Sequence, residues 1–272
     1  MVRFPNAKIN LGLFITEKRT DSYHNIESLM LPVPLCDVLE IVPINDNTFK
    51  NVKLSVSGNP VHCPDEDNLC VKAYHLLADK FSLPSVQIYL HKVIPDGAGL
   101  GGGSSDAASA LLILNDIFSL NLNEKYLEEY ASELGSDCAF FIKNNPAFCS
   151  GRGEIMEATD FHLKGWHLML VFPPVKVSTK DAYAGCIPDA AKFDLRKIQQ
   201  LKPEEWKEKI VNDFEKTVFE KYPLLKEIRD QLYDSGAVYA AMSGSGSTIY
   251  GLYDKLGSDD FSNFSHYKII QL

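Results

Sequence analysis

Five of the seven residues from Gly97 to Gly103 are glycines, and this run is the part of the sequence best suited to binding chemistry. It leads through Ser104 and Ser105 into an apolar stretch with the spacing of a buried helix. Glycines let a backbone approach a ligand closely, and the unpaired N–H groups at the start of a helix favour phosphate. The two serine hydroxyls add donors and potential Mg²⁺ ligands. We therefore predict a phosphate-binding loop here.

Two familiar phosphate-binding motifs do not describe this loop. Gly97, Gly99 and Gly102 satisfy the pattern G-x-G-x-x-G, but the dinucleotide fingerprint needs a βαβ unit, and here the predicted helix is followed by a second helix. A P-loop ends in Gly-Lys-Ser/Thr, and Gly103 stands where the lysine would be. A flexible turn without a ligand is the structural alternative, and so many glycines before an apolar helix disfavour it. We expect a phosphate-cradling loop of neither class.

Lys8 and Asn10 share one face of a predicted strand near the N-terminus. The opposite face is apolar, with residues alternating as Ala7, Ile9, Leu11, Leu13 and Ile15. A lysine and an asparagine on one face could bind an anionic or hydroxylated substrate. A solvated edge of a sheet explains them equally well when the strand is considered alone.

Two further segments place polar groups beside apolar runs. Gly135-Ser136-Asp137 puts one carboxylate just before Cys138–Phe141, where a helix N-cap or turn aspartate is the ordinary explanation. Ser243-Gly244-Ser245-Gly246-Ser247 predicts a tight turn between two strands. This turn needs no function of its own, and it lacks the G-x-S-x-G spacing of a serine hydrolase.

The elements that must position these groups are strands and helices mixed along both halves of the chain. Periodicity and breakers predict strands at 38–44, 52–57, 86–93, 167–172, 237–242, 248–253 and 267–272. They predict helices at 69–80, 104–118 and 124–134, and between 203 and 235 with an interruption before Pro223. This arrangement indicates an α+β fold. A polar stretch around 144–164 suggests two domains, residues 1–155 and 156–272.

Composition limits the class of protein. The chain has 272 residues, 36 acidic and 27 basic side chains and a net charge of −9, which disfavours a nucleic-acid coat or an anionic-membrane protein. A hydrophobic content of 45% excludes general disorder. We find no apolar run of about 20 residues, no secretory signal and no CxxC pair among the six cysteines. We expect a cytoplasmic protein with reduced thiols.

Three ordered motifs resemble the GHMP family of small-molecule kinases. They are Pro5–Leu11, the loop Pro95–Ser105 and the turn Ser243–Ser247, and their order and spacing span nearly the whole chain. Further segments are most similar to the members that act on a methylerythritol linked to cytidine diphosphate: Asp21-Ser22-Tyr23-His24, Gly135-Ser136-Asp137 and Asn212-Asp213-Phe214-Glu215. Two residues depart from the pattern, because Ser22 and Ala98 stand where glycine is usual. The segment 254–266 is also short for the helix that the resemblance implies.

The resemblance implies a two-domain GHMP-kinase-like fold with the active site in the interdomain cleft. It further implies that ATP phosphorylates the 2-hydroxyl of the methylerythritol unit, in the synthesis of isoprenoid precursors. Asp137 matches the general base, and Lys8 would keep that carboxylate ionised and stabilise charge on the γ-phosphoryl oxygens. Asn10 would bind substrate. Mg²⁺ is expected, but the resemblance identifies no ligand set for it, and Ser105 is a candidate ligand.

The resemblance also assigns residues to the two nucleotides. Cytosine would be sandwiched between the rings of Tyr23 and Tyr183, and His24 would read its edge. The candidates for binding this substrate are Asn10, Tyr23, His24, Thr179 and Tyr183. The candidates for binding ATP are Asn68, Lys92, Pro95, Gly97, Ala98, Gly99, Leu100, Gly101, Gly102, Gly103, Ser104 and Ser105.

Alternatives to this substrate remain open from the sequence. Another GHMP kinase, of homoserine or of a mevalonate-type alcohol, should lack the Tyr23-His24 pair and the Asp137 segment. A catalytically inactive nucleotide-binding regulator should have lost Lys8 or Asp137, and the sequence retains both. We expect no nucleic-acid or membrane partner, and the oligomeric state is either a monomer or a weak dimer.

Overall fold

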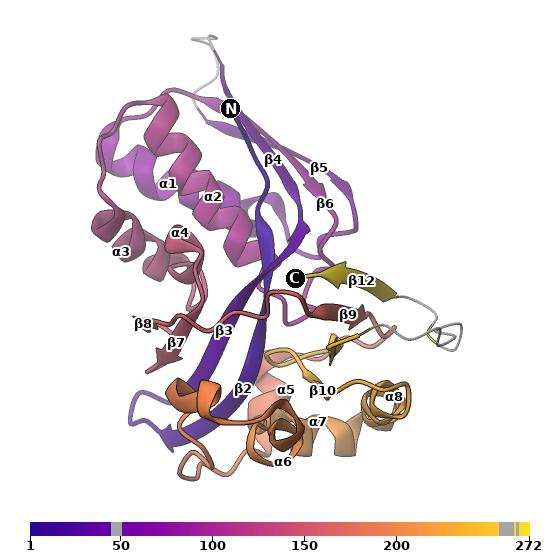
Figure 1. Ribbon diagram of the computed structural model, residues 1–272. Helices are drawn as coiled ribbons and strands as arrows, with labels where there is room; N and C mark the ends of the chain where they lie inside the picture. The colour runs from indigo at the N-terminus through magenta and orange to yellow at the C-terminus, as the bar shows by residue number, and fades with distance from the viewer. Residues whose placement is uncertain (45–50, 256–263, 265–266) are drawn as a thin grey trace. The chain divides into compact units, whose positions relative to one another are not determined.

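The chain forms two compact units, each assembled from separate stretches of sequence (Figure 1). The computed structural model describes residues 1–44, 51–255, 264 and 267–272, so most of the segment 254–266 lies outside it. The first unit holds Met1–Ala7, Leu35–Asp96 and Gly101–Asn145, and the second holds Lys8–Pro34, Gly97–Leu100 and Pro146–Leu272. Residues 8–34 and 97–100 thus belong with the second half, and a domain boundary at 155 stays a prediction.

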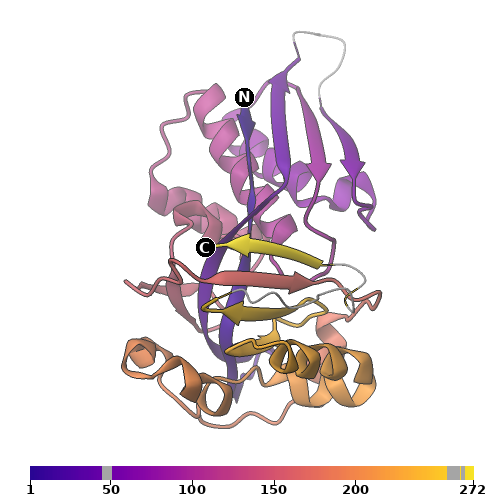
Figure 2. The same ribbon diagram turned by 45° about the vertical axis from the view of Figure 1, so that its right-hand side comes forward.

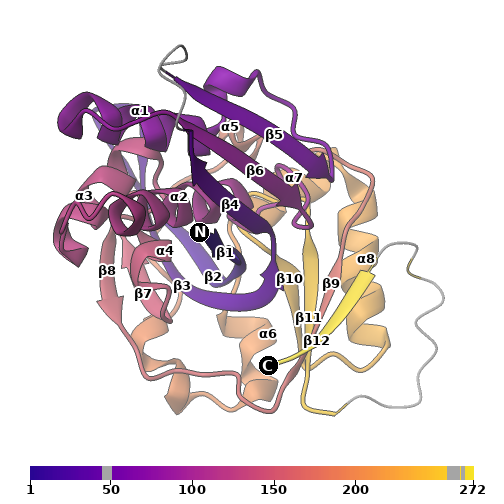
Figure 3. The ribbon, with the colours of Figure 1, turned by 90° about the horizontal axis from the view of Figure 1, so that it is seen from above.

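The sheet of the first unit confirms the three strands predicted there. Its order is β1 (Val2–Arg3), β4 (Val38–Pro43), β6 (Val86–Lys92) and β5 (Val52–Gly58). β4 is antiparallel to β1 and to β6, whereas β5 is parallel to β6. Figure 3 shows these strands side by side from above. A parallel pair needs a crossover connection, and the segment between β5 and β6 supplies it as a helix.

Helices pack together beside this sheet. They are α1 (Leu69–Phe81), α2 (Gly102–Ile117), α3 (Glu124–Leu134) and α4 (Phe140–Lys143), with a 3₁₀ turn at Asp65–Asp67. α2 is largely buried and contacts α1, α3, α4 and β4. α3 has the predicted bounds, whereas α2 begins two residues before the predicted start. The glycines at the end of the loop are therefore already helical.

The second unit contains a sheet that the sequence predicted only in part. Its order is β2 (Asn6–Lys18), β3 (His24–Cys36), β7 (Ala147–Ser150) and β8 (Ile155–Ala158). β3 was missed because Pro32 and Pro34 argue against a central strand. β7 pairs with Ser28–Met30 of β3. The two prolines lie beyond this stretch, so β7 does not need a hydrogen bond from them.

The other sheet of this unit has the order β10 (Tyr239–Met242), β11 (Ile249–Tyr253), β9 (His167–Val171) and β12 (Tyr267–Gln271). All four strands were predicted, but their order was not. Around it lie α5 (Thr179–Ala184), α6 (Trp206–Lys209), α7 (Phe214–Lys221), α8 (Pro223–Asp234) and 3₁₀ turns at Leu195–Gln200 and Pro203–Glu205. α8 packs on β10 and β11 (Figure 2). The predicted helical region is interrupted at 210–213 as well as before Pro223. No helix in the described ranges is both long and apolar enough to cross a bilayer.

Candidate active site

The glycine loop uses its glycines where the backbone demands them. Gly97, Gly99 and Gly101 have φ angles of 67°, 75° and 69°, a region that side chains disfavour. Ala98 has no positive φ, so an alanine is tolerated there. Ser22 is the reverse case, because its φ of 70° explains why the matching position is usually glycine.

The middle of the loop is clamped within the second unit. The backbone N–H of Lys8 donates to the carbonyl oxygen of Leu100 at 2.9 Å. Ser243 Oγ donates to the carbonyl oxygen of Gly99 at 2.9 Å. A Cβ added at Gly99 would lie 2.1 Å from the carbonyl oxygen of Ser243, a contact that no side chain permits. The Ser243–Ser247 turn, which needed no function on sequence grounds, therefore holds the loop.

The helix that follows the loop begins as an anion site would require. Gly101 is the N-cap of α2 and has no side chain to cap the helix, so the first N–H groups have no partner within the helix. A Cβ at Gly102 would lie 2.9 Å from Ile94 Cγ2 and 3.3 Å from Lys92 Nζ. The helix start is thus pressed against the end of β6, which only glycine allows. Backbone N–H groups at such a terminus favour phosphate.

Lys8 and Asn10 are buried, so the solvated-edge interpretation is wrong. Their side chains are 3% and 2% exposed. Lys8 Nζ donates to Asn10 Oδ1, Asn10 Nδ2 donates to Ser28 Oγ at 2.8 Å, and Ser28 Oγ donates to the carbonyl oxygen of Gly12 at 2.7 Å. This chain fixes the ammonium on the strand. The sequence did not single out Ser28, because its partner lies 16 positions away.

The aromatic candidates form one stacked pair and one cation–π contact. The His24 and Tyr183 rings are stacked, with centroids 4.7 Å apart and planes 16° from parallel. Tyr23 is exposed and lies under the Arg152 guanidinium, whose carbon is 4.9 Å from the ring centroid. Thr179 Oγ1 lies 3.4 Å from Ser245 Oγ. The structure thus stacks Tyr183 on His24, and a cytosine sandwich between Tyr23 and Tyr183 stays a prediction.

Lys92 has a structural role in addition to the predicted one. Its buried ammonium donates to both Asp37 and Asp106, the latter at 2.7 Å. Burial raises the pKa of Asp106 to about 7, the lysine opposes this shift and Asp37 adds to it. The cluster joins β6 to the N-terminal half of α2, and so supports the position of the helix. Asp37 and Asp106 were not predicted, since no motif marks them.

Asn68 caps one helix and lines a small cavity of the first unit. Its Oδ1 accepts from the backbone N–H of Cys70 at 2.9 Å at the start of α1. The cavity has a volume of about 240 Å³, enough for a flat heterocycle. Residues from β5 to Asn68 line it, including Leu54, Ser57, Gly58, Pro60 and Cys63.

Asp137 lies in a turn between α3 and α4 and is half-buried. It is not a helix N-cap, because Ala139 holds that position for α4. Asp137 belongs to the first unit and Lys8 to the second. Their pairing stays a prediction.

No three His, Cys, Asp or Glu side chains gather as a metal cage in the part of the chain that the structure describes. Mg²⁺ in phosphoryl-transfer sites keeps several waters and takes phosphate oxygens, so it needs few protein ligands. Ser105, in the first turn of α2, is 2% exposed, and its role as a Mg²⁺ ligand stays a prediction.

Comparisons with known proteins match segments in both halves of the chain. Residues 68–149 match the model of the GHMP kinase N-terminal domain, and residues 187–261 match that of the C-terminal domain. The chain is 53% identical to a 4-diphosphocytidyl-2-C-methyl-D-erythritol kinase of Bacteroides fragilis over 264 residues, 96% of each chain. The protein of the same name from Prosthecochloris aestuarii is 39% identical and is matched by 91% of this chain and 87% of its own.

Solved structures extend the likeness to the fold. A crystal structure of 4-(cytidine 5'-diphospho)-2C-methyl-D-erythritol kinase aligns with a TM-score of 0.78 and 31% identity, over 93% of this chain and 90% of that one. A mevalonate kinase aligns with a TM-score of 0.62 at 14% identity, over 99% and 98%, which shows the shared fold alone. The chain belongs to the GHMP kinase family.

Proposed function

We propose that this protein transfers the γ-phosphoryl group of ATP to the 2-hydroxyl of 4-diphosphocytidyl-2-C-methyl-D-erythritol. The products are the 2-phosphate and ADP, and the step belongs to isoprenoid precursor synthesis. The relative from Bacteroides fragilis carries the name of this activity and matches nearly the whole chain. A cytoplasmic location and a monomer or weak dimer complete the proposal.

The structural observation that carries this proposal is the attachment of Lys8 to the loop. Its backbone N–H bonds the Leu100 carbonyl, and its ammonium is oriented by Asn10. A preorganised cation at a developing charge needs no reorganisation during the reaction, which is the largest single contribution in many enzymes. Lys8 thus stands ready to stabilise charge on the γ-phosphoryl oxygens.

The residues divide the reaction between them. The N–H groups at the start of α2 and residues 97–105 bind the triphosphate, and the cavity at Asn68 takes adenine. Asp137 accepts the proton of the 2-hydroxyl as the new O–P bond forms and the bond to the β-phosphate oxygen breaks. Ser105 is the candidate ligand for Mg²⁺, which would neutralise phosphate charge when bound.

Cytidine recognition falls to the aromatic residues. Tyr23 and Tyr183 offer aromatic faces for a flat base, and a ring nitrogen of His24, which lies against Tyr183, bonds the cytosine edge. Burial lowers the pKa of His24, so a neutral imidazole is favoured at neutral pH. A neutral ring both donates and accepts, as the cytosine edge requires.

Acceptor specificity tests this proposal. Purified protein with MgATP is offered the cytidine-linked methylerythritol, homoserine or mevalonate, and ADP release is followed. We expect turnover with the first acceptor and at most trace rates with the other two. Turnover with homoserine or mevalonate in place of the first would overturn the substrate assignment.

A further inference from the structure

Four consecutive residues, Asn212 to Glu215, contact different parts of the second unit and have no part in the reaction proposed above. Asn212 and Asp213 lie between α6 and α7, and Phe214 and Glu215 are the first two residues of α7. We propose that this segment is a positioning element, which holds the glycine loop, the Lys8 strand and the aromatic pair in register within that unit. This role deepens the proposed function and rests on it.

Asn212 links the segment to the glycine loop. Its Nδ2 donates to the carbonyl oxygens of Met242 at 2.7 Å and Gly244 at 2.8 Å. These two carbonyls flank Ser243, whose hydroxyl donates to Gly99. The Asn212 side chain is 3% exposed, so water cannot replace the amide as donor. An oxygen in place of Nδ2 would face two carbonyl oxygens and repel them.

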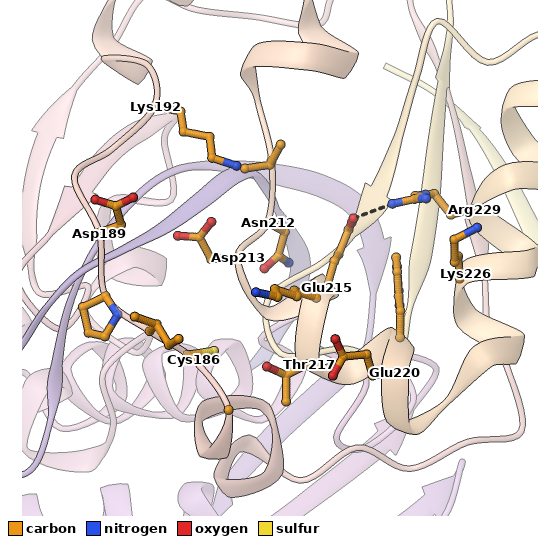
Figure 4. A pocket seen from close by; sticks show the side chains of 16 residues that line it. Cys186, Asp189, Lys192, Asn212, Asp213, Glu215, Thr217, Glu220, Lys226 and Arg229 are labelled. Carbon is orange, nitrogen blue, oxygen red and sulfur yellow. Dashed lines mark hydrogen bonds and ion pairs between the residues drawn. The ribbon is translucent and has the colours of Figure 1, made fainter.

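Glu215 holds the same turn from the end of β10. Its Oε1 accepts the backbone N–H of Met242 at 2.7 Å, and its Oε2 pairs with Arg229 Nη1 at 3.0 Å. A buried carboxylate is costly unless it is paired and hydrogen-bonded, and this one is both. Figure 4 shows the ion pair beside Asn212 and Asp213. The charge pair therefore orients the carboxylate toward the turn.

Asp213 ties the segment to β2, the strand that carries Lys8 and Asn10. Its Oδ2 accepts from the backbone N–H of Ile15 at 2.8 Å, and its own N–H donates to the Leu13 carbonyl at 2.8 Å. Asp213 thus holds β2 at two neighbouring positions, Leu13 and Ile15. A displacement of 212–215 would shift the strand with it.

Phe214 supports the aromatic pair. Its ring packs edge-to-face on Tyr183, with centroids 4.7 Å apart and planes at 87°. Tyr183 in turn stacks on His24. Edge-to-face pairs contribute beyond their buried area, so Phe214 sets the tilt of the ring that faces the cytidine.

Hydrogen bonds rather than packing alone hold this segment. A cavity of about 890 Å³ opens on its other side, and Figure 4 shows Asn212, Asp213 and Glu215 lining it together with Arg229. Open space on that side leaves the position of the segment to the polar contacts described above. Variants of single side chains should therefore disturb separate parts of the site.

The test compares Asn212→Asp with Phe214→Leu, and uses Phe161→Leu as a control that removes a buried ring elsewhere in the unit. Asn212→Asp should raise the KM for ATP about tenfold, with less effect on the KM for the cytidine substrate. Phe214→Leu should raise the KM for the cytidine substrate about three- to tenfold, with less effect on the KM for ATP. Glu215→Gln, which keeps the acceptor for Met242, should retain more activity than Glu215→Leu. Phe161→Leu should leave both KM values unchanged.

A purely structural segment would give a different pattern. Equal changes in both KM values, or lost stability with unchanged kinetics below the melting temperature, would overturn the positioning role. Direct titration of ADP binding, wild type against Asn212→Asp, separates this result from a failure of the proposed function. Weaker ADP binding by the variant supports the inference even if the wild type does not phosphorylate the tested acceptor, and equal binding contradicts it.

Discussion

The hydroxyl of Ser243 donates to the carbonyl oxygen of Gly99 at 2.9 Å, a contact between residues 144 positions apart. It joins a serine- and glycine-rich turn to the middle of the glycine loop. The turn is itself held by Asn212 and Glu215. The conformation of the loop is therefore set from outside the loop, which suits a site that must bind triphosphate without rearranging.

Gly99→Ala should abolish nucleotide binding. An added Cβ would overlap the carbonyl oxygen of Ser243 and also strain a positive φ. Gly165→Ala is the matched control, because Gly165 has a φ of 87° and no atom within 4 Å of its added Cβ. ATP titration and thermal melts should show a binding defect for Gly99→Ala alone. Normal ATP affinity in that variant would refute the clamped loop.

Lys8→Met should reduce kcat about 10²- to 10³-fold, the size expected for loss of one preorganised electrostatic group. Methionine preserves the length of the buried side chain, so the strand should keep its place. Steady-state rates with saturating substrates measure the effect, and a melting curve checks the fold. A folded variant within tenfold of wild type would show that the ammonium is structural.

Asp137→Asn should slow turnover about 10²- to 10⁴-fold, because the amide cannot accept the hydroxyl proton. Binding of ATP should persist, since the base touches the acceptor and not the nucleotide. Single-turnover rates and ATP titration separate the two properties. Near-normal rates would remove Asp137 from the role of general base.

Asp106 predicts a pH dependence of stability. Its pKa in the folded protein, about 7, exceeds the ordinary 3.8, so the folded state retains a proton that the unfolded chain loses. Stability should therefore be full below about pH 4 and fall as pH rises toward 7, by at most about 1.4 kcal/mol per unit. The free energy of unfolding, measured with urea at several pH values, should fall less steeply with pH in Asp106→Asn, because the asparagine stays neutral. The same pH dependence of the free energy of unfolding in wild type and variant would exclude a contribution from Asp106.

The sequence predicted the elements that carry local signals. The glycine loop, α3 and most strands follow from breakers and periodicity. β3 was missed because Pro32 and Pro34 conceal it, and the burial of Lys8 was not foreseen because one strand cannot reveal what covers its second face.

Contacts distant in sequence were beyond prediction from the residues alone. Asp37 and Asp106 meet around Lys92 only after the chain folds. The roles of Ser28 and of the Ser243–Ser247 turn likewise depend on partners that no local pattern names. The spacing of residues in the sequence therefore could not predict polar contacts between residues far apart in the chain.

The position of the new phosphate is the most direct test of the central claim. Carbon 2 of the acceptor carries a methyl group and no hydrogen, whereas carbon 3 carries one hydrogen and carbon 1 carries two. The ³¹P spectrum of the product, from wild-type protein with MgATP, should show a phosphomonoester without three-bond coupling to a proton. A doublet or a triplet would place the phosphate on another hydroxyl, and no phosphomonoester at all would contradict the proposed activity.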